Sequence, residues 1–175
     1  VEATPAEIVY ILPNNKNIIM AAQQCQGLTE KNVVVIPSKT VPQGITAMMN
    51  VDPEAQVESI TAAMTDALST VTTSQITYAA RDSDFGGFTI KQGDYLALEE
   101  HQLFGTDQDL DALLDRLARS DTHQSAEFIS IFYGEDVTEA QGQKAEAIFA
   151  AACPNAEVSL LPGGQPVYYY MISAE

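Results

Sequence analysis

Residues 8–20 read IVYILPNNKNIIM, and the rest of the chain can be interpreted outward from this stretch. Its first five residues are apolar and rich in β-branched side chains, which predicts a strand buried on both faces, as in parallel sheets. Pro13 ends the run because it has no N–H for a sheet ladder. Asn14 and Asn15 are expected to cap a helix over residues 15–28, since their side-chain oxygens can accept its first N–H groups. The stretch therefore predicts a strand, a turn and a helix.

The same pattern recurs further along the chain. Residues 33–36 form a second apolar run, which Pro37 ends. Thr40 and Gln43 then have the spacing of a capping box, in which each side chain accepts a backbone N–H of the other residue. They predict a short helix over residues 43–50.

A further helix is predicted after Asp52 and Pro53, which form an N-cap and first-turn pair. A strand is expected at residues 75–80. Residues 81–106 then change character, with short alternating runs and turn signals such as Gly86–Gly87. This part is interpreted as small antiparallel strands that connect two lobes.

The last part of the chain again alternates helices and strands. Thr106 is predicted to cap a helix with a leucine stripe, and Thr138 and Gln141 form another capping box. The strands expected here cover residues 128–133, 156–161 and 167–172.

These elements predict an α/β fold of two lobes, with mainly parallel sheets, flanking helices and a small antiparallel connector. The first lobe is placed at residues 1–80, the connector at 81–106 and the second lobe at 107–175. At 175 residues the chain is expected to be one compact domain.

Charge and composition exclude some partners. The chain has 24 acidic and 8 basic residues, a formal net charge of −16, which argues against binding nucleic acid or anionic lipid surfaces. No apolar run approaches the ~20 residues of a membrane span, and no signal peptide is visible. The two cysteines lack metal or redox spacing and suit a reducing compartment. A cytoplasmic location without membrane insertion is therefore expected.

Candidate binding residues follow the predicted strands, where parallel sheets place their ligand sites. Two interpretations are open: a site for a small anion or an acidic partner surface, or simple capping of helices by Asn and Thr. The residues at this expected rim are Asn14, Asn15, Lys16, Ser38, Lys39, Thr40, Arg81, Asp82, Tyr133, Glu135 and Asp136.

Signs of catalysis are weak. His101 and His123 are expected to be solvated surface residues. Gly163–Gly164 lacks the spacing of a phosphate loop, and is interpreted as a hairpin or bulge turn in which glycine supplies positive φ. No catalytic residue and no metal ligand is assigned.

A family resemblance adds to this interpretation. Residues 11–20 (ILPNNKNIIM), 35–44 (VIPSKTVPQG) and 76–82 (ITYAARD) resemble the C-terminal domain of the bacterial fatty acid kinase large subunit, the dihydroxyacetone-kinase-like or YloV-like group. Collinear matches continue at 90–95 (IKQGDY), 132–136 (FYGED) and 163–168 (GGQPVY).

The resemblance implies a DegV-like or dihydroxyacetone-kinase-like fold and a chain that is a piece of a longer protein. It implies that ATP and magnesium bind an N-terminal kinase domain absent from these residues, so that this part has no cofactor and is not a kinase by itself. The partners it implies are the other domains of that kinase and a DegV-like fatty-acid-binding protein.

Two functions are therefore expected. The first is an accessory domain that docks the DegV-like carrier so that the kinase can phosphorylate its fatty acid. The preferred contacts are Lys39, Arg81 and the loop residues Gly163, Gly164, Gln165 and Tyr168. The alternative is a domain that binds a lipid or another small ligand in its own right.

Overall fold

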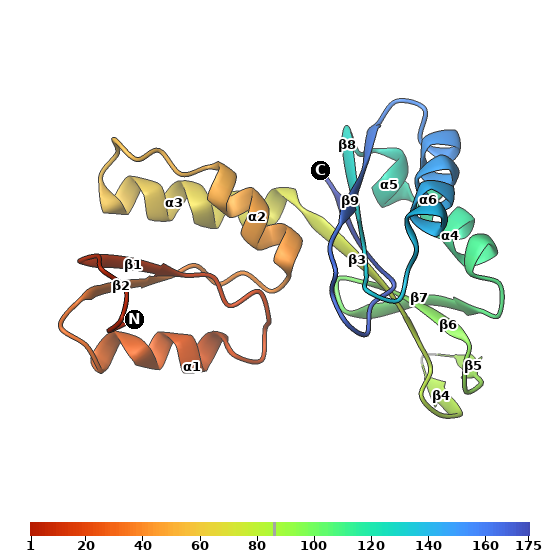
Figure 1. The fold of residues 1–175 in the computed structure, drawn as a ribbon, viewed down its shortest axis with the longest axis horizontal. Coiled ribbons are helices and arrows are strands. Elements are labelled where there is room, and N and C mark those ends of the chain that lie inside the picture. The colour runs from red at the N-terminus through yellow and green to blue at the C-terminus, as the bar shows by residue number, and fades with distance from the viewer. Residues whose placement is uncertain (86) are drawn as a thin grey trace. The chain divides into compact units, whose positions relative to one another are not determined.

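A computed structural model describes residues 1–85 and 87–175 (Figure 1). Gly86, half of a turn signal in the sequence, lies outside the described residues. The chain forms two compact units, Val1–Val71 (unit 1) and Thr72–Glu175 (unit 2). Strand β3 (Thr72–Tyr78) therefore opens unit 2, whereas the sequence pattern placed it at the end of the first lobe.

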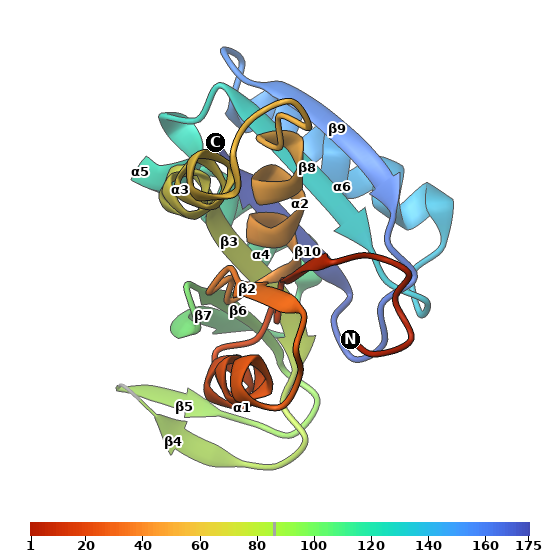
Figure 2. The ribbon, with the colours of Figure 1, turned by 90° about the vertical axis from the view of Figure 1, so that its left-hand side faces the viewer.

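Unit 1 is built on two parallel strands. β1 (Ile8–Ile11) pairs with β2 (Asn32–Val35), as the apolar runs predicted. The crossover between them contains helix α1 (Ile19–Gln24) and a 3₁₀ turn (Cys25–Gly27). Figures 1 and 2 show α1 on one side of these strands and helices α2 (Val41–Met49) and α3 (Val57–Ala67) on the other.

Helix α1 begins later than predicted. Its N-cap is Ile18, without a side-chain cap, because Asn15 instead accepts a hydrogen bond from the Asn17 N–H (2.9 Å) in a local turn. The expectation that Asn14 and Asn15 cap this helix is therefore wrong. An asparagine oxygen that reaches an N–H two residues ahead forms a turn that competes with helix formation.

Helix α2 (Val41–Met49) starts where the capping residue predicted. The Thr40 hydroxyl accepts a hydrogen bond from the Gln43 N–H (3.3 Å). Helix α3 (Val57–Ala67) follows and leads into a 3₁₀ turn (Leu68–Thr70). It begins after Gln56 and not at Asp52, whose carboxylate accepts from the Glu54 N–H (3.0 Å) in a turn.

Unit 2 contains a six-stranded sheet in the order β7-β6-β3-β10-β8-β9. Only β8 and β9 are parallel, and every other neighbouring pair in this sheet is antiparallel. The prediction of mainly parallel sheets is therefore wrong for this unit. The six strands are β3 (Thr72–Tyr78), β6 (Tyr95–Glu99), β7 (Gln102–Asp107), β8 (Phe128–Tyr133), β9 (Glu157–Pro162) and β10 (Tyr170–Ala174).

The sheet of unit 2 is mostly antiparallel because of the position of its last strand. β10 lies between β3 and β8 and is antiparallel to both, while β6 and β7 form a hairpin at the edge. β4 (Ser83–Phe85) and β5 (Phe88–Ile90) pair in a separate small antiparallel sheet. Helical crossovers predicted parallel pairing, but they did not reveal which strand would lie between two others.

The helices described in unit 2 are α4 (Leu110–Ala118), α5 (Asp121–Gln124) and α6 (Glu139–Ala152), and α4 packs against α6. The capping box of Thr138 and Gln141 is confirmed. Thr106 does not cap α4, because its hydroxyl donates to the Tyr95 carbonyl within the sheet (3.0 Å). Asp109 caps the helix instead, and its carboxylate accepts from the Asp111 N–H (2.9 Å).

Candidate functional site

The turns that follow β1 and β2 meet at one edge of unit 1. Because the strands are parallel, their carboxyl ends lie side by side. The Asn14 N–H donates to the Ser38 hydroxyl (3.1 Å), and that hydroxyl donates to the Asn14 side-chain oxygen (2.7 Å). Asn14 has a left-handed backbone (φ 54°), and Ser38 is fully buried. Two of the predicted rim residues thus form one hydrogen-bonded pair.

Helix α2 approaches this pair closely. A Cβ atom on Gly44 would lie 2.2 Å from the Asn14 side-chain oxygen, so no larger residue fits there without a shift. The first turn of α2 is anchored in the same place, since the Lys39 N–H donates to the Gln43 side-chain oxygen (2.9 Å). Thr40 therefore caps a helix, which is one of the two interpretations that the sequence left open, while Asn14 and Ser38 hold the two turns together.

The side chains of Lys16 and Lys39, the two lysines at this edge, are available for binding and are not used in packing or capping. Lys16 and Lys39 are exposed, and neither takes part in an ion pair within the described part of the chain. Asn15 is exposed as well, apart from its bond to the Asn17 N–H. Positive charge that is not used inside the protein is available to a partner.

An apolar hollow adjoins the edge, with a volume of about 450 Å³. It was not predicted from the sequence. Its lining combines side chains of the segment after β1 with side chains of α2: Leu12, Asn14, Gly44, Ile45, Met48 and Met49.

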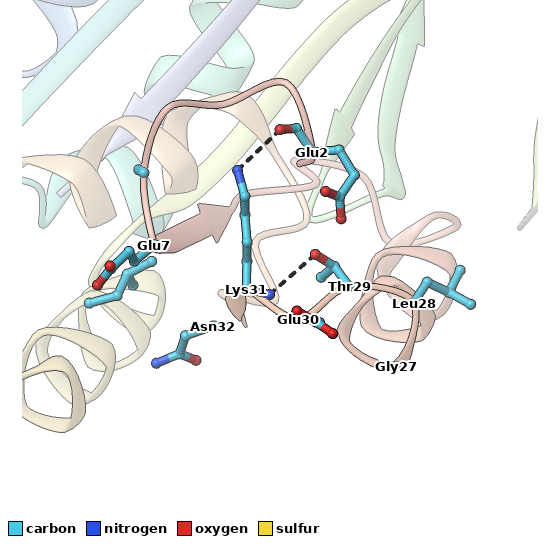
Figure 3. A pocket seen from close by; sticks show the side chains of 10 residues that line it. Glu2, Glu7, Gly27, Leu28, Thr29, Glu30, Lys31 and Asn32 are labelled. Carbon is cyan, nitrogen blue, oxygen red and sulfur yellow. Dashed lines mark hydrogen bonds between the residues drawn. The ribbon is translucent and has the colours of Figure 1, made fainter.

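A second, larger hollow lies at the amino ends of β1 and β2, with a volume of about 980 Å³ (Figure 3). Glu2, Glu7 and Glu30 give it a negative lining. Lys31 also lines it, but its amine donates to the backbone carbonyls of Glu2 (3.1 Å), Val1 (3.2 Å) and Thr4. Its charge is therefore used to hold the first residues of the chain.

In unit 2 the predicted site residues also gather at one edge. β3 and β8 run in the same direction on either side of β10, so the turns after them and the loop before β10 share that edge. The N–H groups of Gly163 and Gly164 donate to the Tyr133 carbonyl (2.9 and 3.0 Å), and the Glu135 N–H donates to the Gln165 carbonyl (3.1 Å). The loop 163–168 is thus tied to the turn after β8.

This loop is not a hairpin turn, because β9 and β10 are not neighbours in the sheet. The expected positive φ does occur at Gly164 (62°). It also occurs at Val167 (71°), where a β-branched side chain makes it costly. The Val167 carbonyl accepts from the Thr77 hydroxyl (3.1 Å), and its side chain is 59% exposed. A strained residue that presents an apolar side chain is typical of a binding loop.

The turn after β3 is organised by Asp82. Its carboxylate accepts from the Gln92 N–H (2.8 Å) and pairs with Lys91 (3.3 Å), and these bonds, the Gln92 one first, lower the pKa of Asp82. Asp82 therefore links the turn after β3 to the segment between β5 and β6, which carries Lys91 and Gln92. Arg81 is exposed and has no ion pair among the described residues.

The expectation of a solvated His123 is wrong. The ring is fully buried, with its Nδ1 atom 2.9 Å from the Ser120 hydroxyl and 4.0 Å from the Glu99 carboxylate. Burial lowers the pKa of His123 to about 4, against the smaller, opposite effect of the Leu117 carbonyl. Burial also raises the pKa of Glu99. Helix α5, which carries this histidine, was missed because residues 121–124 are polar.

Within residues 1–85 and 87–175, no group of three or more His, Cys, Asp and Glu side chains could hold a metal ion. None of the described helices is long and apolar enough to cross a membrane.

Comparison of the sequence with known proteins finds a family and curated relatives. The family model for the C-terminal part of fatty acid kinase A-like proteins matches residues 1–175. Protein YloV of Bacillus subtilis is 35% identical over 175 residues, which are 100% of this chain and 32% of YloV. The chain thus spans about a third of the length of the curated relatives it matches.

Two solved structures share the fold. The fatty acid kinase B3 protein of Streptococcus pneumoniae, loaded with linoleic acid, aligns with a TM-score of 0.67 at 13% identity, covering 98% of this chain and 72% of that one. The DegV family protein Cg2579 of Corynebacterium glutamicum aligns with a TM-score of 0.64 at 15% identity, covering 95% and 73%. The architecture is therefore DegV-like, and the chain belongs to the C-terminal family of fatty acid kinase A-like proteins.

Proposed function

We propose that this chain is the accessory part of a fatty acid kinase that docks a DegV-like fatty-acid carrier, so that a kinase domain elsewhere in the protein can phosphorylate the carried acid. The observation that carries the proposal is the match of all 175 residues to a family described by its place in fatty acid kinase A-like proteins. ATP and magnesium would then bind outside these residues.

The surfaces of both units support a docking role. Lys39 and Arg81 are exposed cations without an ion pair in the part of the chain that the structure describes. The loop 163–168 is held by backbone hydrogen bonds and presents Val167. Rigid, exposed contacts bind with a small loss of conformational entropy.

The proposal is tested by calorimetric titration of the chain with the DegV-like carrier of the same organism, loaded with fatty acid and unloaded. We expect saturable binding, and we expect Lys39→Glu together with Arg81→Glu to weaken it by about tenfold at low salt, because the contacts are charged and lie at the rim.

Lys144→Glu together with Arg119→Glu is the control, since it makes the same charge change at an exposed lysine and an exposed arginine of unit 2 that already pair with Asp111 and Asp115. Affinity that the variant at Lys39 and Arg81 leaves unchanged would show that these two cations are not contacts. A wild-type chain that does not bind either form of the carrier would rule out the docking function.

The second candidate function, direct binding of a lipid or another small ligand, would use the apolar hollow beside Asn14. The same instrument distinguishes the two functions: heat from linoleate added to the chain alone, without any from the carrier, would favour the second.

A further inference from the structure

Helix α2 is amphipathic, but its apolar face points outward. The residues that it buries are small or polar: Pro42, Gln43, Gly44, Thr46 and Ala47. The large apolar side chains are exposed. We name these the α2 stripe: Val41 (43% exposed), Ile45 (40%), Met48 (54%) and Met49 (79%).

The stripe is a single continuous face, because its positions follow the helical spacing i, i+4, i+7 and i+8. Helix α2 also contains no charged residue, although 18% of the chain is charged. In a surface helix the charged residues normally face water and the apolar residues face the core. A contiguous apolar face left toward water is the mark of an interaction surface.

The shape of this surface favours a protein over a small ligand. A pocket for a small molecule buries most of its ligand's surface. Here the hollow is bordered by Met48 and Met49, which are themselves more than half exposed. An acyl chain lying there would remain largely in water, whereas the surface of a protein could cover the whole stripe.

The charged residues beside the stripe indicate which kind of protein surface would bind it. The hydrogen bonds between Asn14 and Ser38 bring the segments that carry Lys16 and Lys39 to the start of α2. Both lysines are exposed, and neither has an ion pair within the described residues. Two positive charges beside an uncharged apolar face are complementary to an apolar ridge bordered by carboxylates. A second copy of this chain fits less well, because a formal charge of −16 opposes self-association.

We propose that the α2 stripe is the centre of the docking surface, and that it receives an apolar ridge of the fatty-acid carrier whose flanking carboxylates face Lys16 and Lys39. This inference rests on the proposed function and adds its contact surface. The two methionines at the carboxyl end of the stripe suit such a role, because their unbranched side chains adapt to the shape of a partner. The charged rim guides association, and the apolar centre holds the complex.

The test compares two substitutions at equally exposed apolar residues of unit 1. Met49→Gln removes apolar contact at the stripe, and Leu28→Gln makes the same kind of change at a side chain that is 82% exposed and lies after the 3₁₀ turn. Neither residue belongs to the buried core, so both variants should keep the wild-type melting temperature. The probe is the DegV-like carrier loaded with linoleic acid, titrated into the intact chain.

We expect Met49→Gln to weaken carrier binding by at least about tenfold and Leu28→Gln by less than about twofold. The loss at Met49 should persist when salt is raised, whereas the loss caused by Lys39→Glu should shrink, because salt screens charges but not apolar burial.

The outcomes separate the two proposals. If the wild-type chain binds the carrier but Met49→Gln binds equally well, docking stands and the α2 stripe is not its centre. If the wild-type chain does not bind the carrier, the docking function itself fails. Direct binding of linoleate, or a concentration-dependent dimer, that Met49→Gln abolishes would overturn the inference in favour of an acyl chain or a second copy.

Discussion

The two units of this chain use their apolar residues differently. Unit 2 gathers them into one large buried cluster between its sheet and helices, including Leu113, Ile131, Phe149 and Ile172. The buried cluster of unit 1 contains only Ile36, Ala47, Ile60 and Met64 among the described residues. Unit 1 nevertheless carries most of the exposed large hydrophobic side chains, with the α2 stripe among them.

This difference indicates a division of roles. Apolar area that stays in water contributes nothing to folding stability, so a small unit that leaves it exposed benefits from it only when a partner covers it. Of the nine exposed large hydrophobic residues described in unit 1, four lie on one face of α2, where a single partner surface could bury them together. Unit 2 has the more extensive core and is expected to be the more resistant to mutation at its surface.

The largest expected effect tests the core of unit 2. Phe149 is fully buried, and its ring packs edge-on against that of His123, with centroids 5.3 Å apart. Phe149→Ala should lower the free energy of unfolding by about 3–5 kcal/mol, because it leaves a cavity in a packed interior. Urea unfolding followed by circular dichroism measures the loss.

Phe85→Ala is the control, at a side chain of the same unit that is 64% exposed, and it should change stability by less than about 0.5 kcal/mol. Equal losses for the two variants would contradict the contrast between the core and the surface.

The next-largest effect is a pH dependence of stability, which should come from unit 2 because the buried histidine, His123, belongs to that unit. The pKa of His123 is about 4 in the folded chain, against about 6.5 in an unfolded one. Between these values the unfolded chain binds more protons, so stability that is complete above pH 6.5 should fall by up to about 3 kcal/mol as the pH drops to 4.

The raised pKa of Glu99 acts in the opposite direction, because its burial penalty is relieved as the carboxylate takes up a proton. Unfolding free energies should therefore be compared as slopes against pH. His123→Gln should flatten the fall between pH 6.5 and 4, whatever its own effect on stability. A slope that the variant leaves intact would assign the acid sensitivity to other groups.

The smallest effect concerns unit 1, at the contact between α2 and the turn after β1. Gly44→Ala places a methyl group against the Asn14 side-chain oxygen and should cost about 1–3 kcal/mol. Asn14→Gly removes that oxygen and tolerates the positive φ, so Gly44→Ala should cost much less in its presence. If thermal melting shows the same loss in both backgrounds, Asn14 does not set the approach of α2.

Much of the local structure could be predicted because it depends on residues close together in the sequence. The apolar run at residues 8–12 contains β1, and the run at 128–133 is β8 to the residue. The capping residues Thr40 and Thr138 mark the starts of α2 and α6, because an N-cap acts on N–H groups only a few residues away. The family, too, was recognisable from collinear motifs.

Local patterns in the sequence were thus enough to show that this chain alternates strands and helices, where several of them begin, and which family it belongs to. Three features emerged only from the packed molecule: β10 enters between β3 and β8 and makes the larger sheet mostly antiparallel, His123 is buried, and the apolar face of α2 lies in water. The physical reason is the same in each case. Periodicity and capping report on neighbours along the chain, whereas strand order and burial depend on segments far apart in sequence, whose packing no local pattern contains.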